Sequence, residues 1–475
     1  MRVMTTSCRV VHAEPPGETS RVRCRCTRWH RLHSRSTSGV LLPKRGTDDS
    51  PGVWRAAALQ ITLREEDNLM SDIHASALQI SRRLAQLSPS ATVGLGGKIA
   101  ALRARGVDVI SFGQGEPDFA TPAVLKAAGI AAIEKNLTKY TPVGGPADLR
   151  AAIARQVSAA TGVEYGAAQI SVTTGAKEAL FLAFMATCDD GDEVIIPAPY
   201  WVSYVDQVRM AGATPVIVTA GPEVGFKVTA ARLADALSPR TRAVVLNSPS
   251  NPTGAVYSAA EWRALADVLH DSAALIVTDE IYDAIVYGEY ARWLRVAPEF
   301  AGRTLVVNGA SKAYAMTGWR MGYVAGPLPV IEAIKAIQSH STTHTASITQ
   351  AAVLPAYDGS ADLSGEVAMM VAAFRERRDV IVELLREVPG VEVQVPDGAF
   401  YVFPKVRGLL GRPLGTSGTV CATDDDLAAF LLDAAHIGVV PGSAFGMPGF
   451  LRLSYATSLD QIREGMRRFA AAVGS

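Results

Sequence analysis

Residues 304–312 read TLVVNGASK, a short apolar run that ends in Asn308 and Gly309 and is followed by Lys312. Buried strands of parallel sheets are continuous apolar runs rich in Val and Ile, so this stretch predicts a strand over Thr304–Val307. A lysine directly after a buried strand is unusual, because its ammonium must be desolvated or paired. Such lysines serve Schiff-base chemistry, which needs a reachable neutral amine; a surface lysine at a strand end is the alternative.

Runs of the same kind recur on both sides of this stretch and alternate with helical patterns. They are Glu193–Ile196, Thr214–Val218, Ala243–Leu246, Leu275–Thr278 and Tyr323–Ala325. Apolar strands separated by helices indicate an α/β fold, with a mostly parallel sheet covered on both faces. Val107–Ile110 predicts an earlier strand, Val371–Val388 predicts a long helix, and a smaller α+β unit follows to the C-terminus.

The chain divides into four predicted segments. Residues 70–117 form an N-terminal arm and part of a smaller domain, 118–338 a large domain, and 339–475 the rest of the smaller domain. Residues 1–69 differ, because arginines far outnumber acidic residues in the opening stretch and no helical or strand period is sustained. This segment is either an organellar transit peptide or an upstream extension of a chain that starts at Met70, and we expect it to be disordered.

Composition narrows the class of protein. The 475 residues are 48% hydrophobic and carry a net charge of zero, so no bulk field attracts nucleic acid or a membrane surface. The five cysteines show no disulfide or metal-knuckle spacing, which favours a reducing compartment, the cytoplasm. No apolar run approaches the roughly 20 residues that span a bilayer. We therefore expect a soluble enzyme acting on small metabolites.

Polar residues gather directly after three of the predicted strands. Asn247–Gly254 follows one strand, Asp279-Glu280 another, and Ser311-Lys312 a third. In open α/β sheets, ligands bind outside the carboxyl ends of the strands, so these segments point to one crevice.

Seven short motifs occur in order between Ser88 and Phe469, nearly all of the chain after its leader. They are Gly115-Glu116-Pro117-Asp118-Phe119, Tyr140-Thr141-Pro142-x-x-Gly145, Pro199-Tyr200-Trp201-x-Ser203-Tyr204, Asn247-x-Pro249-x-Asn251-Pro252-Thr253-Gly254, Asp279-Glu280-x-Tyr282, Ser311-Lys312 with Gly318-Trp319-Arg320, and Arg452-Leu453-Ser454-Tyr455-Ala456. Each is weak alone, but together they resemble the class I, fold-type I aminotransferases, particularly the bacterial aspartate aminotransferase branch. The resemblance implies a seven-stranded sheet between helices, a smaller α+β domain, and pyridoxal 5'-phosphate as cofactor.

The resemblance also assigns roles around the cofactor ring. Lys312 holds the cofactor as a Schiff base and later moves a proton. Asp279 keeps the pyridine nitrogen protonated, so that the ring accepts electrons. Asn251 and Tyr282 bond the cofactor's phenolic oxygen, and Trp201 stacks on the ring.

Phosphate binding requires a helix N-terminus and a cation. The stretch Thr174-Gly175-Ala176-Lys177 leads into a predicted helix and offers backbone amides, those of Ala176 and Lys177 among them. The resemblance adds Arg320, as a bidentate partner, and Tyr140, reaching across from a second subunit of a homodimer. Gly309 departs from the pattern, because many relatives have serine there, and this removes one expected phosphate contact.

The substrate site follows from the same resemblance. Arg452 grips the α-carboxylate, with help from the amide of Gly115, while Phe400 borders the pocket. A second carboxylate would meet Lys177 with Ser90 and Thr92, which favours L-aspartate, with L-glutamate and 2-oxoglutarate as the partner pair. Prephenate also has a second carboxylate and is the alternative substrate. A broad-specificity aminotransferase and a carbon–sulfur lyase of the same fold are the alternative activities.

Two other patterns carry no predicted site. Gly94-Leu95-Gly96-Gly97-Lys98 resembles a phosphate loop, but no strand precedes it and Ile99 stands where Ser or Thr is needed. His340 and His344 have the spacing of helical metal ligands but lack an evident third ligand, so no metal is expected. The stretch 339–350 that contains them is instead a candidate lining of a dimeric active site.

Overall fold

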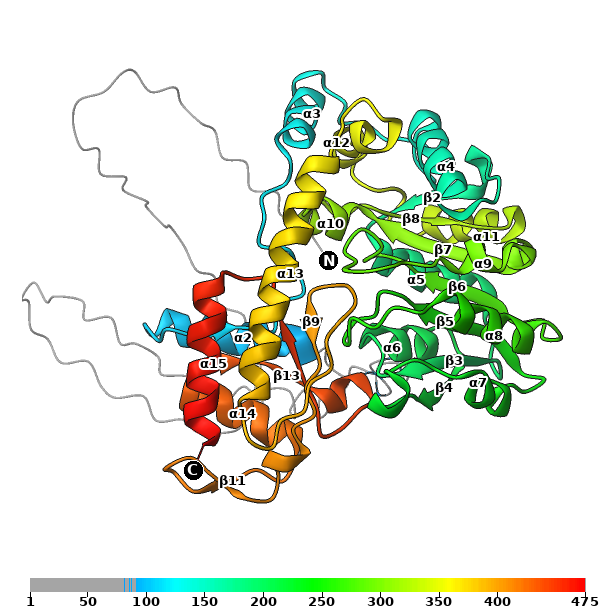
Figure 1. The fold of residues 1–475 in the computed structure, drawn as a ribbon. Helices are drawn as coiled ribbons and strands as arrows, with labels where there is room; N and C mark the ends of the chain where they lie inside the picture. Colours follow the sequence, from blue (N-terminus) through cyan, green and yellow to red (C-terminus); the bar gives the residue numbers. More distant parts are fainter. Residues whose placement is uncertain (1–80, 82–84, 86, 88–90, 475) are drawn as a thin grey trace, which may run out of the picture. The chain divides into compact units, whose positions relative to one another are not determined.

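The stretch 304–309 is the strand β7 (Thr304–Gly309) of a seven-stranded sheet, with strand order β2-β8-β7-β6-β5-β3-β4 (Figure 1). The computed structural model describes residues 81, 85, 87 and 91–474. The expected disorder of residues 1–69, the start at Met70 and the role of Ser90 fall outside these residues.

The sheet is mostly parallel, as predicted. Its other strands are β2 (Ile170–Thr173), β3 (Glu193–Ala198), β4 (Thr214–Thr219), β5 (Thr241–Asn247), β6 (Leu275–Asp279) and β8 (Gly322–Ala325). β4, β3, β5, β6 and β7 run in one direction, and β8 is antiparallel to both of its neighbours, β7 and β2. The strand predicted at Tyr323–Ala325 therefore exists but runs against the others.

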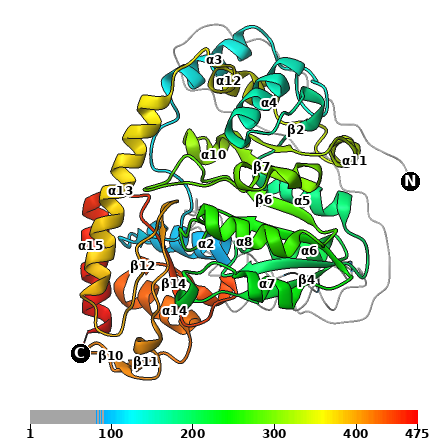
Figure 2. The same ribbon diagram turned by 45° about the vertical axis from the view of Figure 1, so that its right-hand side comes forward.

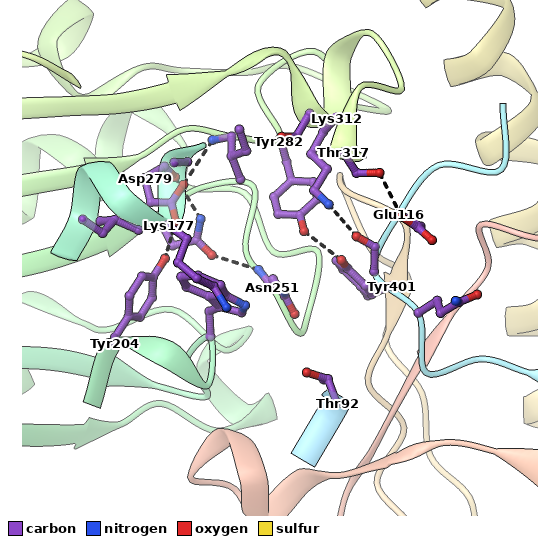
Figure 3. Close-up of a pocket in the computed structure, with 18 of the residues that line it drawn as sticks. Thr92, Glu116, Lys177, Tyr204, Asn251, Asp279, Tyr282, Lys312, Thr317 and Tyr401 are labelled. Atoms are coloured by element: carbon purple, nitrogen blue, oxygen red, sulfur yellow. Dashed lines mark hydrogen bonds between the residues drawn. The ribbon is translucent and has the colours of Figure 1, made fainter. Parts of the chain in front are cut away.

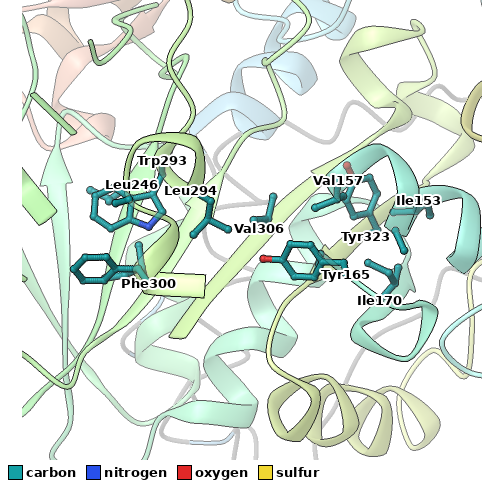
Figure 4. Packing of buried hydrophobic residues seen from close by; sticks show 14 of the residues in the cluster. Ile153, Val157, Tyr165, Ile170, Leu246, Trp293, Leu294, Phe300, Val306 and Tyr323 are labelled. Atoms are coloured by element: carbon teal, nitrogen blue, oxygen red, sulfur yellow. The ribbon is translucent and has the colours of Figure 1, made fainter. Parts of the chain in front are cut away.

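Helices cover both faces of this sheet because successive strand residues point to opposite sides. On β5, Ala243 and Val245 pack with α5 (Ala176–Thr187), α6 (Ser203–Met210) and α11 (Leu328–Ser339). Val244 and Leu246 face the other core, with α4 (Ala147–Thr161), α8 (Ala259–Leu269) and α9 (Trp293–Val296). Figure 4 shows part of this second core, where Trp293 and Phe300 lie beside Leu246.

A third core joins the C-terminal part of the chain to residues 110–112. It contains α13 (Ser364–Arg386), α14 (Asp424–Ala435), α15 (Leu459–Val473), the parallel pair β1 (Ile110–Ser111) with β12 (Ile437–Gly438), and the antiparallel sheet β13 (Val440–Pro441), β14 (Leu451–Ser454) and β9 (Tyr401–Val402). The long helix predicted over Val371–Val388 is confirmed, although α13 begins one to two turns earlier. The strand predicted over Val107–Ile110 is wrong in extent, since β1 begins only at Ile110.

Figures 1 and 2 both show α13 beside α15, away from the seven-stranded sheet. α12 (Ser347–Asp358) follows the predicted boundary at residue 338, yet it packs on α3 (Ala123–Glu134) and α4 in the core of the sheet. The positions of the domain boundaries therefore stay a prediction. No described helix is long and apolar enough to cross a membrane.

Candidate functional site

The ends of three neighbouring parallel strands form one wall of a cavity of about 430 Å³ (Figure 3). β5 ends at Asn247, β6 at Asp279 and β7 at Gly309, and the Asn247 side-chain amide donates to the Asp279 carbonyl at 2.8 Å. This is the crevice predicted from the polar segments that follow the strands. The predicted site residues that line it are Thr92, Gly115, Ala176, Lys177, Trp201, Asn251, Asp279, Tyr282, Lys312, Arg320 and Arg452.

Lys312 reaches the cavity from α10 (Ala310–Ala313), a short helix that directly follows β7. Its Nζ donates a hydrogen bond to the Gly115 carbonyl. Removal from water lowers the pKa of the Lys312 amine to about 8, although the Glu116 carboxylate opposes this shift. The amine is therefore neutral far more often near neutral pH than an ordinary lysine.

This lowered pKa predicts selective reactivity of Lys312 toward an amine-acylating reagent. With a pKa of about 8, roughly a tenth of the amine is neutral at pH 7, against roughly one in three thousand for an ordinary lysine. In protein stripped of cofactor, where the Lys312 amine is free, we expect its labelling rate, followed by peptide mass spectrometry, to rise through half of its maximum near pH 8. The exposed Lys126 on α3 is the internal control. Equal pH profiles for the two lysines would contradict the predicted pKa.

Asp279 is a buried carboxylate with two hydrogen-bond donors around it. The Tyr204 hydroxyl donates to its Oδ2 at 2.6 Å, and the Ile281 amide donates to its Oδ1 at 3.2 Å. Burial raises the pKa of Asp279, and the bond from Tyr204 opposes that change. Within the described part of the chain it forms no salt bridge, so a cationic N–H group of a ligand would suit this position.

An anion cradle lies where α5 begins. A Cβ atom on Gly175 (φ +82°) would come 2.6 Å from Arg320 Nη2, and one on Gly322 would come 2.3 Å from the Ala176 nitrogen. The Arg320 guanidinium donates to the carbonyls of Thr317 and Thr174 and pairs with no carboxylate in the described ranges. A helix N-terminus beside a guanidinium without an acidic partner suits a phosphate group.

The glycine at 309 has a steric cause. A Cβ atom there would lie 2.6 Å from the Met321 carbonyl oxygen and 2.8 Å from Gly322 Cα, on the neighbouring strand. A serine would therefore require the two strands to separate at this point.

Arg452 lies on β14 and is only 2% exposed. Its Nη1 donates to Asn251 Oδ1 at 3.2 Å and its Nη2 to the Gly113 carbonyl at 2.6 Å, whereas its Nε has no hydrogen-bond partner among the described residues. The guanidinium lies over the rings of Tyr401 and Phe445, at 4.8 and 5.1 Å from their centroids. Such a buried cation needs a carboxylate partner. The described residues supply none, so a ligand carboxylate would complete the site.

Lys177 provides a second cation in the same cavity. Its Nζ lies 4.9 Å from the centroid of the Trp201 indole. Burial, followed by repulsion from Arg320, lowers the pKa of the Lys177 amine. Thr92 enters the cavity from α2 (Ala91–Ala104), as Figure 3 shows. The cavity can therefore receive a ligand that bears more than one negative group.

Two predicted residues do not line this cavity. Tyr140 is 89% exposed, and its ring meets His344 edge-on at 5.6 Å. Phe400 is fully buried in the third core, while Tyr401 beside it lines the cavity. Tyr204, Glu116 and Thr317 also line it but received no predicted role. The Thr317 hydroxyl donates to Glu116 at 2.8 Å, which fastens the segment that carries Gly115.

The two other sequence patterns have ordinary structural roles. Gly94–Lys98 lies within the helix α2 and forms no loop. His344 accepts a hydrogen bond from the Thr141 amide through Nε2 at 3.4 Å, and its Nδ1 lies 2.7 Å from the Thr345 carbonyl. His344 thus carries its proton on Nδ1, and the ring uses both nitrogens within the protein.

Residues 107–469 match the family model described as aminotransferase class I and II. The aspartate/prephenate aminotransferase of Cereibacter sphaeroides is 45% identical, over 82% of this chain and 98% of its own length. The crystal structure of the aspartate aminotransferase from Rhizobium meliloti aligns with a TM-score of 0.79 and 43% identity, over 83% of this chain and 99% of that one. That of the Thermus thermophilus aspartate aminotransferase with maleate aligns with a TM-score of 0.78 and 41% identity, with the same coverage.

Proposed function

We propose that the amino donor of this chain is L-aspartate and that its cofactor is pyridoxal 5'-phosphate. The premise is that the chain belongs to the class I and II aminotransferases and has their fold-type I architecture. The chain is an aminotransferase. L-Glutamate and 2-oxoglutarate form the second substrate pair of a ping-pong cycle. The observation that carries the aspartate assignment is a cavity with two cations, Arg452 and Lys177, that can each meet a carboxylate.

The residues of the cavity fit pyridoxal phosphate. The cofactor presents a phosphate, a ring nitrogen that can carry a proton, and an aldehyde. The cradle of Gly175 and Arg320 suits the phosphate, the buried Asp279 suits the protonated nitrogen, and the amine of Lys312 suits the aldehyde. The chemical complementarity of these three groups supports the cofactor assignment.

When bound, the cofactor supplies a carbonyl that captures amines and a ring that withdraws electrons from the adjacent carbon. Asp279 holds a proton at the ring nitrogen, and Tyr204 keeps that carboxylate oriented through its 2.6 Å hydrogen bond. Asn251 and Tyr282 donate to the ring's phenolic oxygen, while Trp201 lies against the ring. Arg320, with the backbone amides of Ala176 and Lys177, holds the phosphate.

The substrate is oriented by its carboxylates. Arg452 and the amide of Gly115 hold the α-carboxylate, which directs the hydrogen on Cα toward Lys312. The neutral Nζ of Lys312 takes this proton, and its lowered pKa favours that role near neutral pH. Lys177, Thr92 and Ser90 hold the distal carboxylate of aspartate. The maleate named with the Thermus thermophilus relative is likewise a dicarboxylate, which supports this assignment.

Substitution of Lys177 by alanine tests the aspartate assignment. We expect kcat/KM for aspartate to fall by about 30- to 1000-fold, because a buried charge pair is lost, while alanine and phenylalanine lose less than about threefold. The measurement is a single-turnover series over several amino acids, followed by the absorbance of the bound cofactor. Lys126→Ala, on the exposed face of α3, is the control. Equal losses for all amino acids would assign Lys177 to the cofactor alone.

Prephenate is the second candidate substrate, because the relative from Cereibacter sphaeroides is named for both activities and prephenate carries a second carboxylate. The same single-turnover series, run with the amino acid that is the transamination product of prephenate, shows whether the enzyme acts on this compound, on aspartate or on both. A carbon–sulfur lyase of this fold would release pyruvate from cysteine conjugates, which is assayed directly.

We also propose a homodimer with shared sites. Tyr140 is 89% exposed, and Leu137, three residues earlier in the chain, and Ile130 and Ile133 on α3 are exposed as well. An exposed aromatic that belongs to a cofactor motif supports contact with a second subunit. Light scattering that finds a fully active monomer would exclude this arrangement.

A cytoplasmic location is consistent with the free, buried thiols of Cys188 and Cys421, and cell fractionation tests it.

A further inference from the structure

Tyr401 links the two halves of the active site. It opens the strand β9, which pairs with β14, and its backbone partner there is Ser454, two residues after Arg452. Its side chain lines the cavity at the ends of the parallel strands, where Figure 3 shows it beside Tyr282 and Lys312. The residue is fully buried, so its phenol must be paired within the protein or with a ligand.

The hydroxyl of Tyr401 has a single polar partner in the described structure, the hydroxyl of Tyr282 at 2.7 Å. A Cβ atom on Gly115 would lie 2.6 Å from this hydroxyl, so the phenol also packs against the segment that accepts the Lys312 hydrogen bond. Because each phenol carries one proton, only one of the two can donate in this pair. If Tyr401 donates, the proton of Tyr282 is free to point at the cofactor.

Electrostatics favour Tyr401 as the donor. Burial raises the pKa of both phenols. At Tyr401 the cation of Arg452 is the first group that opposes this rise, whereas at Tyr282 the neighbouring Tyr401 adds to it and the pKa lies well above the usual value. The more acidic phenol is the better hydrogen-bond donor. The ring of Tyr401 also supports Arg452, whose guanidinium carbon lies 4.8 Å from the ring centroid.

We infer that Tyr401 is a positioning residue with two separable parts: its hydroxyl orients the Tyr282 proton toward the cofactor's phenolic oxygen, and its ring holds Arg452 for the α-carboxylate. This inference rests on the proposed cofactor. A donor to the phenolic oxygen stabilises the deprotonated form of the bound chromophore. Loss of the Tyr401 hydroxyl weakens that donor and raises the pH at which the chromophore titrates.

The test compares Tyr401→Phe with the matched control Tyr455→Phe. Tyr455 is fully buried in the same core, and its hydroxyl bonds Tyr287 and the Ala399 carbonyl without lining the cavity. Spectrophotometric pH titration of the holoenzymes measures the midpoint of the cofactor's absorbance change. We expect Tyr401→Phe to raise this midpoint by about half a pH unit with KM for aspartate unchanged, and Tyr455→Phe to leave it unchanged.

Tyr401→Leu tests the role of the ring that holds Arg452, because this variant removes the ring as well as the hydroxyl. We expect it to raise KM for every amino acid by roughly three- to tenfold, in addition to the shift of the midpoint. An unchanged or lowered midpoint in Tyr401→Phe overturns the hydroxyl's role, and a KM in Tyr401→Leu equal to that of Tyr401→Phe overturns the ring's role. If the wild-type protein shows no cofactor absorbance that changes with pH, the proposed function itself is contradicted.

Discussion

Substitution of Lys312 by alanine is expected to lower amino-group transfer by at least about 10⁴-fold, the largest loss among the variants considered. The cavity lining contains two amines, and only that of Lys312 lies beside the Gly115 backbone and the Tyr282 ring. Alanine removes both the proposed covalent anchor of the cofactor and the proposed base for the Cα proton. The remaining residues still bind the phosphate and the ring, so cofactor binding should survive while turnover does not.

The readouts separate these two losses. Reduction with borohydride should fix the cofactor to the peptide that contains residue 312 in the wild type and in Lys177→Ala, and to no peptide in Lys312→Ala. Equilibrium dialysis should still detect bound cofactor in Lys312→Ala. If Lys312→Ala retains more than about a tenth of the wild-type rate, the assigned base is wrong.

The parts of the fold that follow from chain pattern were predictable from sequence. Buried strands such as Val244–Leu246 and Leu305–Val307 are apolar throughout, and this signal depends only on neighbouring residues. The polar groups Asn247, Asp279 and Lys312 directly follow such strands, so parallel pairing brings them together without further information. Six of the seven strands and the crevice were therefore expected from the sequence; β2 was not, and the family resemblance supplied the strand number.

Other parts depend on geometry that a sequence does not carry. Phe400 and Tyr401 are neighbours at the start of a strand, and such neighbours point to opposite sides; only the packing of β9 decides which side is the cavity. Tyr204 meets Asp279 across 75 positions of sequence, through the packing of α6 on the sheet. The role of Tyr140 rests on the proposed second subunit. The alternation of side chains along β9 was the available signal, but a strand of two residues is too short to show which side chain faces the cavity.

The structure gives these site residues a common physical property. Asp279, Lys312 and Arg452 are ionisable groups withdrawn from water, and none forms a salt bridge with another described residue. A fold optimised for stability alone would pair or replace such groups, since an unpaired buried charge is costly. Each position is instead matched by a group of the proposed ligands. Asp279 suits the protonated ring nitrogen of the cofactor, Lys312 its aldehyde, and Arg452 the α-carboxylate of the substrate.

Arg452→Met follows from this argument and has the second-largest expected effect. The variant removes the fork proposed to bind the α-carboxylate, which all amino acids share, so we expect kcat/KM to fall by about 30- to 5000-fold for every donor. Lys177→Ala, in contrast, should discriminate among donors. Arg452→Lys keeps the charge but loses the planar fork, and its loss should be intermediate.

The same substitution should not destabilise the cofactor-free protein. Arg452 is 2% exposed, its Nε is unpaired, and no described carboxylate meets it, so methionine of similar length relieves a desolvation cost. The opposing cost is the loss of two hydrogen bonds, because the Gly113 carbonyl and Asn251 Oδ1 no longer accept from the guanidinium. We expect the melting temperature of the cofactor-free variant to equal or exceed that of the wild type, measured by calorimetry. A clearly lower melting temperature, together with equal activity on all donors, would show that Arg452 serves the fold and not the substrate.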